Sequence, residues 1–164
     1  MKLRNILFYI FLTLSVATYT WILVESGVNG TNSASESLGL VNSFIEWVKT
    51  FDPTSPIVQD PETTHTVIRK LVGHFLFFGL AGTFTSLSFV FIEDGLVKRK
   101  VESIILMAGV GFSLALFSEL IQLATPGRFF AFTDVLIDFS GYVLFAAIVY
   151  LIAFLIYRSK EKKK

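Results

Sequence analysis

Four long apolar segments restrict this chain more than any other feature of its sequence. They cover residues 6–24, 71–92, 103–124 and 134–157. Each is long enough to cross the roughly 30 Å hydrocarbon core of a bilayer as a helix. In the whole chain of 164 residues, 53% are hydrophobic and only 16% are charged, whereas a soluble domain has about 25% charged residues. We therefore expect an all-α integral membrane protein, a bundle of four transmembrane helices in a single domain over residues 1–157, with a basic tail at 158–164.

The first apolar segment has a signal peptide as its alternative interpretation. Lys2 and Arg4 precede it, and residues 15–17 have the small-x-small spacing of a cleavage site. Apolar character continues past that point, however, with Tyr19 and Trp21 where an interfacial aromatic belt would lie. Because the segment is longer than a normal signal-peptide core, we expect an uncleaved first span.

Residues 25–68 form a long polar connection between the first two spans. Part of it predicts one short amphipathic helix that lies on the membrane surface or caps the bundle. Further on, Asp60 can cap a helix, Pro61 suits the first helical position and Glu62 complements the helix dipole. A helix should therefore start there and continue into the second span. The apolar residues at helical spacing in the connection are Leu38, Val41, Phe44, Ile45, Val48 and Phe51.

The basic residues predict the orientation of the bundle. Ten lysines and arginines lie in the terminal segments and the 93–102 loop, and four lie on the opposite side. Because basic residues accumulate on the cytoplasmic side, we expect both termini to be cytoplasmic. The 25–68 connection and the 125–133 turn would then face outwards.

Ionisable side chains gather at the outward ends of the last three spans. Such groups cost roughly 2.5–3.5 kcal/mol each at a helix centre, so they pair, stay near an interface or serve a function. Lys70 and His74 share one helix face, Asp134 and Asp138 share another, and Glu119 precedes Gln122 by one turn. We expect them to meet at one depth in an outward-facing pocket. The candidate ligand-binding residues are Arg69, Lys70, His74, Glu119, Gln122, Arg128, Asp134 and Asp138, and the candidate catalytic residues are His74, Glu119 and Asp134.

Structural explanations exist for most of these residues. Arg69 can extend to lipid headgroups, Asp134 can complement a helix dipole, and Gln122 can bond helix to helix. Glu119 has the weakest structural explanation because it lies well inside an apolar helix. A metal site of His74 with two carboxylates is an alternative, but no dense spacing of histidines and aspartates demands one. We expect no metal and no cofactor, and the absence of cysteine excludes disulfides.

Several motifs, taken in order, resemble the VanZ-like family of small bacterial membrane proteins, which is named for a teicoplanin-resistance accessory protein. The motifs are R-K-x-x-x-H-F at 69–75, S-E-x-x-Q at 118–122, P-G-R at 126–128, and T-D-V-L at 133–136 followed by Gly141. The resemblance covers about residues 6–155. One departure is Asp138, where the family pattern usually has asparagine. The resemblance implies the bacterial plasma membrane and a role in the cell envelope and glycopeptide resistance, but no reaction.

Three functions fit these residues. In the first, a non-enzymatic protein binds an anionic or amphipathic envelope molecule, such as a membrane lipid, a cell-wall lipid intermediate or a lipoglycopeptide. In the second, a membrane-embedded hydrolase or transferase acts on a lipid-linked substrate with His74 or Glu119 as general base. In the third, a small lipid transporter forms a homo-oligomer, because four spans are few for a monomeric carrier. No motif for nucleic acid is present.

Overall fold

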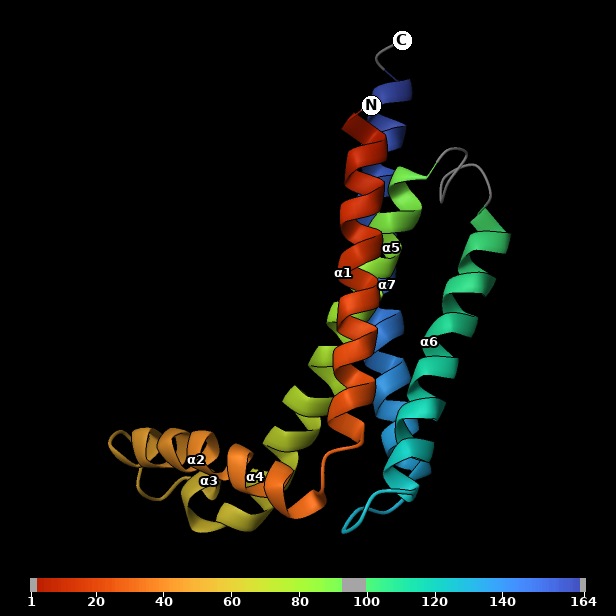
Figure 1. Ribbon diagram of the computed structural model, residues 1–164. Coiled ribbons are helices and arrows are strands. Elements are labelled where there is room, and N and C mark those ends of the chain that lie inside the picture. The colour runs from red at the N-terminus through yellow and green to blue at the C-terminus, as the bar shows by residue number, and fades with distance from the viewer. Residues whose placement is uncertain (1–2, 93–99, 163–164) are drawn as a thin grey trace.

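The computed structural model describes residues 3–92 and 100–162, and every regular element in these ranges is a helix (Figure 1). Residues 70–76 form a π-helical segment that joins α4 to α5, so residues 61–91 make one continuous helix. The elements are α1 (Leu3–Ser26), α2 (Gly30–Lys49), α3 (Pro56–Gln59), α4 (Pro61–Arg69), η1 (Lys70–Leu76), α5 (Phe77–Phe91), α6 (Lys100–Leu123) and α7 (Phe132–Glu161).

Four of the described helices are long and apolar enough to cross a membrane, which confirms the predicted all-α, four-span architecture. These spans are Leu3–Ser26, Pro61–Phe91, Val101–Leu123 and Phe132–Lys160. The start of α1 and the end of α7 lie together at one end of the bundle (Figure 1). Lys98 and Arg99 of the predicted basic loop, and the tail residues 163–164, lie outside the described residues. The side of the membrane on which each end lies remains the prediction made from charge.

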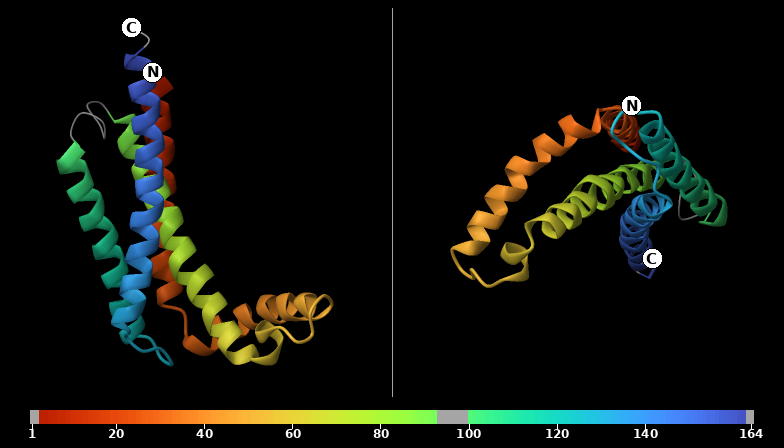
Figure 2. Two further views of the ribbon diagram at one scale, coloured as in Figure 1. Left: turned by 180° about the vertical axis from the view of Figure 1, so that it is seen from behind. Right: turned by 90° about the horizontal axis from the view of Figure 1, so that it is seen from below.

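The connection between the first two spans contains more helix than its sequence predicted. The amphipathic helix is confirmed as α2, but it begins at Gly30, and the single turn α3 was not predicted. α2 projects sideways from the bundle, and α3 and α4 bring the chain back (Figure 2). Val41 and Ile45 of α2 are buried, while several of its large apolar residues stay exposed. The predicted start at Asp60 is confirmed, because its carboxylate accepts a bond from the backbone N–H of Thr63 at 3.1 Å.

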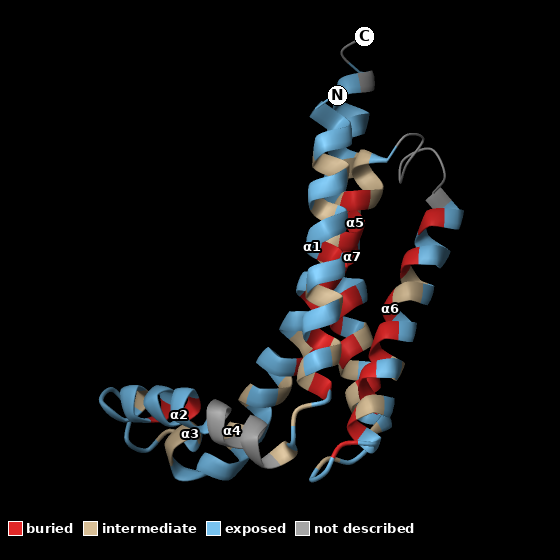
Figure 3. Ribbon diagram, viewed as in Figure 1, coloured by how far each residue is buried: buried red, intermediate tan, exposed pale blue. Residues whose placement is uncertain are grey.

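The core lies where α5 and α7 pack closely against each other (Figure 3). Gly82 of α5 makes this approach possible, since a Cβ atom there would collide with the backbone of Tyr142, and Gly141 of α7 permits a similar approach to the backbone of Phe75 in η1. Small residues serve the same purpose in many membrane helix pairs. Tyr142 is fully buried beside this contact, and the Tyr19 hydroxyl bonds to Thr85 and lies 3.4 Å from the Tyr142 hydroxyl. The core therefore fixes α1, α5 and α7 at defined heights, and with them the polar residues nearer the α2 end.

Candidate functional site

Two side-chain pairs connect the second span to the last one. Lys70 Nζ donates to Asp134 Oδ1 at 2.6 Å, and His74 Nδ1 lies 3.0 Å from Asp138 Oδ1. Both helices run in the same direction (Figure 1), and in each helix the two residues are four positions apart. The pairs therefore stack one turn above the other. The predicted meeting of these four residues is confirmed.

The π-helical segment η1 carries both Lys70 and His74. A π-helix closes its hydrogen bonds at i→i+5, so its turn is wider than that of an α-helix, and such turns recur at functional sites. The segment keeps both side chains facing α7 while its Phe75 backbone contacts Gly141. No proline or other sequence signal marks the π segment, so it could not be predicted.

Glu119 is fully buried, and both of its carboxylate oxygens accept hydrogen bonds. Gln122 Nε2 donates to Oε1 at 2.5 Å, and the backbone N–H of Ala131 donates to Oε2 at 3.0 Å. This explains how an apolar helix tolerates the carboxylate. Glu119 also ties α6 to the residues that lead into α7.

Arg128 braces the turn between α6 and α7 against the end of α1. Its guanidinium donates to the carbonyl oxygens of Val28 at 2.9 Å and Glu25 at 3.2 Å, and to Gln122 Oε1 at 3.1 Å. Partial burial lowers the pKa of Arg128 from its ordinary value, but a guanidinium remains charged at any physiological pH. Gly127 adopts a φ of 74°, a left-handed conformation that glycine tolerates, and so turns the chain just before Arg128.

A cavity of about 750 Å³ lies beside this cluster, among α1, α2 and the second span. Trp21, Val41, Phe44 and Phe77 are among the residues that form its apolar walls. Its polar lining includes four of the predicted ligand-binding residues, namely Arg69, His74, Gln122 and Arg128. The other four, Lys70, Glu119, Asp134 and Asp138, are not among the lining residues; they bond to lining residues or to each other.

Sequence reasoning missed the contribution of α1 and α2 to this cavity. Arg128 donates to the backbone carbonyls of Glu25 and Val28, at and just after the end of α1. Every residue has a backbone carbonyl, so no pattern of residue types indicates these contacts. Glu25 and Ser26 also line the cavity, and their only signal was their position at the end of an apolar span. The α2 residues were recognised as amphipathic, but nothing in their spacing indicated what they face.

One group of described side chains has the geometry to hold a metal ion. His74, Glu119 and Asp134 each offer a ligand atom, and these atoms lie within 4.8 Å of one another. The carboxylates already have protein partners, however: Asp134 pairs with Lys70, and both oxygens of Glu119 accept bonds. An incoming cation would have to displace the Lys70 ammonium.

Asp138 is the least satisfied member of the cluster. It is fully buried, and only Oδ1 has a partner; among the described side chains its Oδ2 is the one buried polar atom without a hydrogen bond. A buried acceptor without a partner costs about 1–3 kcal/mol. The carboxyl group at this position is therefore held at a cost to stability.

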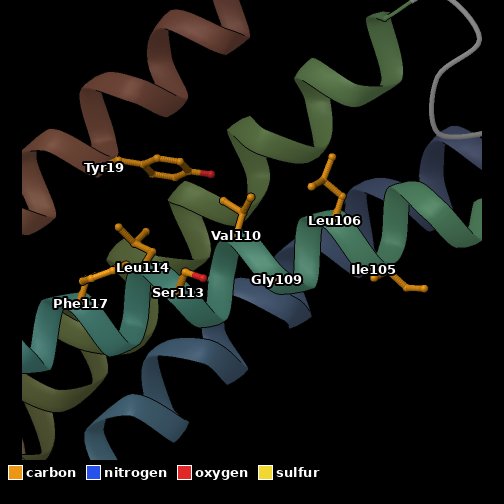
Figure 4. A pocket seen from close by; sticks show the side chains of 8 residues that line it. All are labelled: Tyr19, Ile105, Leu106, Gly109, Val110, Ser113, Leu114 and Phe117. Atoms are coloured by element: carbon orange, nitrogen blue, oxygen red, sulfur yellow. The ribbon is translucent and has the colours of Figure 1, made fainter.

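A second hollow, of about 570 Å³, lies between α1 and α6 (Figure 4). Its lining is mainly aliphatic, with the hydroxyl groups of Tyr19 and Ser113 as its polar side chains. It contains no cation or carboxylate, so it offers nothing that would hold a charged group.

The fold and the polar cluster define a multi-pass membrane protein with a mainly apolar cavity at the α2 end of its bundle, and Arg69 and Arg128 are among the residues that line this cavity. The VanZ/LLP1 family model matches residues 6–155, and the chain belongs to this family. The resemblance expected from the sequence motifs is thereby confirmed. No curated protein and no solved structure matches the chain significantly.

Proposed function

We propose that this protein binds an anionic amphiphile of the bacterial cell envelope in the cavity among α1, α2 and the second span. The observation that carries the proposal is the composition of that cavity: among its described lining residues, two guanidinium groups stand against one carboxylate, that of Glu25, and most of the other walls are apolar. Its volume of about 750 Å³ falls within the range of about 300–1,000 Å³ that is usual for small-molecule sites. A membrane lipid, a cell-wall lipid intermediate and a lipoglycopeptide all combine an acidic group with an apolar chain.

The two arginines have different roles in this proposal. Arg128 is held in place by its bonds to α1 and Gln122, so its charge is preorganised. Arg69 is exposed, lines the cavity, and pairs with no carboxylate in the part of the chain that the structure describes. Guanidinium groups bind phosphates and carboxylates with two parallel hydrogen bonds. Arg69 is thus the cation that remains available for a ligand.

The charge bias of the chain supports an outward-facing cavity. With the termini in the cytoplasm of a bacterial cell, the α2 end of the bundle lies at the outer headgroup layer of the plasma membrane. Envelope intermediates and glycopeptide antibiotics meet in that layer. A protein that binds either of them there would contribute to glycopeptide resistance, as the family's name-giving member does.

The test compares Arg69→Gln with Lys49→Gln in purified protein reconstituted into nanodiscs. Lys49 is also an exposed cation near the α2 end, but it does not line the cavity. Loss of a charge-assisted hydrogen bond costs about 1.5–3 kcal/mol, and solvent exposure of Arg69 favours the lower value, so the Kd for a fluorescent lipid phosphate should rise about tenfold. Lys49→Gln should leave the Kd unchanged.

Two results would overturn the proposal. One is an equal Kd for both variants and the wild type. The other is equal binding of a zwitterionic lipid with the same chains, because the cationic lining would then contribute nothing. In a susceptible host, the wild-type protein should raise the inhibitory concentration of teicoplanin, and Arg69→Gln should not.

A further inference from the structure

We infer that the cavity also hydrolyses its ligand: His74, oriented by Asp138, activates a water that attacks the terminal phosphoryl group of a lipid phosphate. The inference rests on the proposed function and narrows the ligand to a lipid monophosphate or diphosphate. Binding alone does not require a histidine paired with a buried carboxylate. The inference gives this pair a role in a reaction.

The geometry of His74 is that of a general base. The residue is 8% exposed and lines the cavity. Its Nδ1 lies 3.0 Å from Asp138 Oδ1. In the proposed reaction, the tautomer with a proton on Nδ1 donates that proton to the carboxylate, and Nε2 is the acceptor. The same division of roles between a histidine and an aspartate operates in hydrolases of unrelated folds.

The identity of Asp138 indicates that the His74–Asp138 pair has a role beyond holding the two helices together. An asparagine could accept the same hydrogen bond without burying a charge, yet the chain has a fully buried carboxylate whose second oxygen has no partner. A full negative charge beside the ring stabilises the imidazolium that forms when His74 takes up a proton. A residue that disturbs stability in this way is typical of a functional site.

The cations supply the second requirement of phosphoryl transfer. Arg69 and Arg128 line the same cavity as His74. Phosphoryl transfer depends mainly on positioning the group and on stabilising charge on its equatorial oxygens. The apolar walls would hold the lipid chain, and the orientation predicted from charge would place the phosphate at the outer headgroup layer, where water is present.

The step balances with water as the only co-reactant. The water oxygen forms a bond to phosphorus while the bond from phosphorus to the leaving oxygen breaks. His74 Nε2 takes one proton from the attacking water. The leaving oxygen takes a proton from solvent at the cavity mouth, and His74 returns its proton to the same solvent. The products are inorganic phosphate and either a lipid alcohol, from a monophosphate, or a lipid monophosphate, from a diphosphate.

The experiment measures phosphate release and lipid binding on the same nanodisc preparation. Phosphatidic acid and a polyprenyl diphosphate serve as separate substrates, which distinguishes a membrane-lipid source from a cell-wall carrier. We expect the wild type to release phosphate from at least one of them. If it binds these lipids and releases phosphate from neither, the inference is overturned and the proposed binding function stands. If it binds neither, both are wrong.

Variants then test the residues. His74→Gln should lower kcat by about 10²–10⁴-fold, the usual contribution of a general base, whereas His65→Ala, at the chain's other histidine, should not. Asp138→Asn, which keeps a hydrogen-bonding partner but removes the charge, should lower kcat by a similar factor of about 10²–10⁴ and leave KM within about threefold. Full kcat in either His74→Gln or Asp138→Asn would refute the assignment. Size-exclusion profiles identify any variant that fails to fold, and the other variant then decides.

Discussion

Removing Arg128 should loosen the whole α2 end of the molecule as well as the cavity. The guanidinium donates three hydrogen bonds: one to the Glu25 carbonyl in the last turn of α1, one to the Val28 carbonyl just after α1, and one to Gln122. Buried charge-assisted bonds contribute about 1.5–3 kcal/mol each, but polar contacts in membrane proteins average about 0.6 kcal/mol. Because Arg128 is partly exposed, we expect Arg128→Ala to cost about 2–4 kcal/mol in total.

Thermal unfolding in detergent measures this cost. Each 1 kcal/mol lowers Tm by about 2–4 °C in a chain of this size, so Arg128→Ala should lower Tm by about 4–16 °C. Arg128→Lys should recover less than half of the loss, because one ammonium cannot reach all three acceptors. Arg158→Ala, at an exposed arginine near the end of α7, is the matched control and should not change Tm. An Arg128→Ala protein as stable as this control would show that the brace contributes nothing.

The remaining predictions concern the ion pair, helix packing, metal binding and one helix cap. A double-mutant cycle of Lys70→Met and Asp134→Asn should give a coupling energy of about 1 kcal/mol, and a value near zero would contradict the pairing. Gly141→Ala should destabilise the protein by about 1–3 kcal/mol, whereas Gly109→Ala, which faces open space, should not; equal Tm values would refute the close packing. Elemental analysis should find substoichiometric divalent metal in the wild type and more in Lys70→Met, because the ammonium no longer neutralises Asp134; a stoichiometric ion in the wild type would contradict this. Hydrogen bonds at the start of α4 lower the pKa of Asp60. Its capping contribution to stability is therefore present above the ordinary aspartate pKa and is lost as the pH falls through the lowered pKa. Amide exchange at the start of α4 should accelerate over that pH range in the wild type, and should not do so in Asp60→Asn.

The pairing of the second span with the last one was predictable because helical spacing is visible in sequence. Lys70 and His74, like Asp134 and Asp138, are four residues apart. The topology predicted from the basic residues puts both of these helix ends at the same depth in the membrane. We therefore expected the oppositely charged side chains on the two helices to pair. The separation of these groups into cavity lining and supporting residues was not predictable, because it depends on the side to which each helix is rotated.

Features that depend on backbone groups could not be predicted. Glu119 is satisfied partly by the Ala131 N–H, and Arg128 by two carbonyl oxygens. Every residue carries such groups, so no residue type indicates them. The π-helical turn of η1 likewise packs against α7, and no residue type within it indicates a π-helix. Tertiary context decided these details, whereas composition and periodicity decided the number and the position of the spans.

The measurement that tests the account most directly is photo-crosslinking of a diazirine-labelled phosphatidic acid in nanodiscs, read by mass spectrometry. Two hollows compete for the lipid: the cationic cavity and the hollow between α1 and α6 in Figure 4. If the lipid binds in the cationic cavity, we expect labelling near Phe44 and Phe77 that is lost in Arg69→Gln. Labelling confined to the region of Leu106 and Val110, and unaffected by Arg69→Gln, would contradict it.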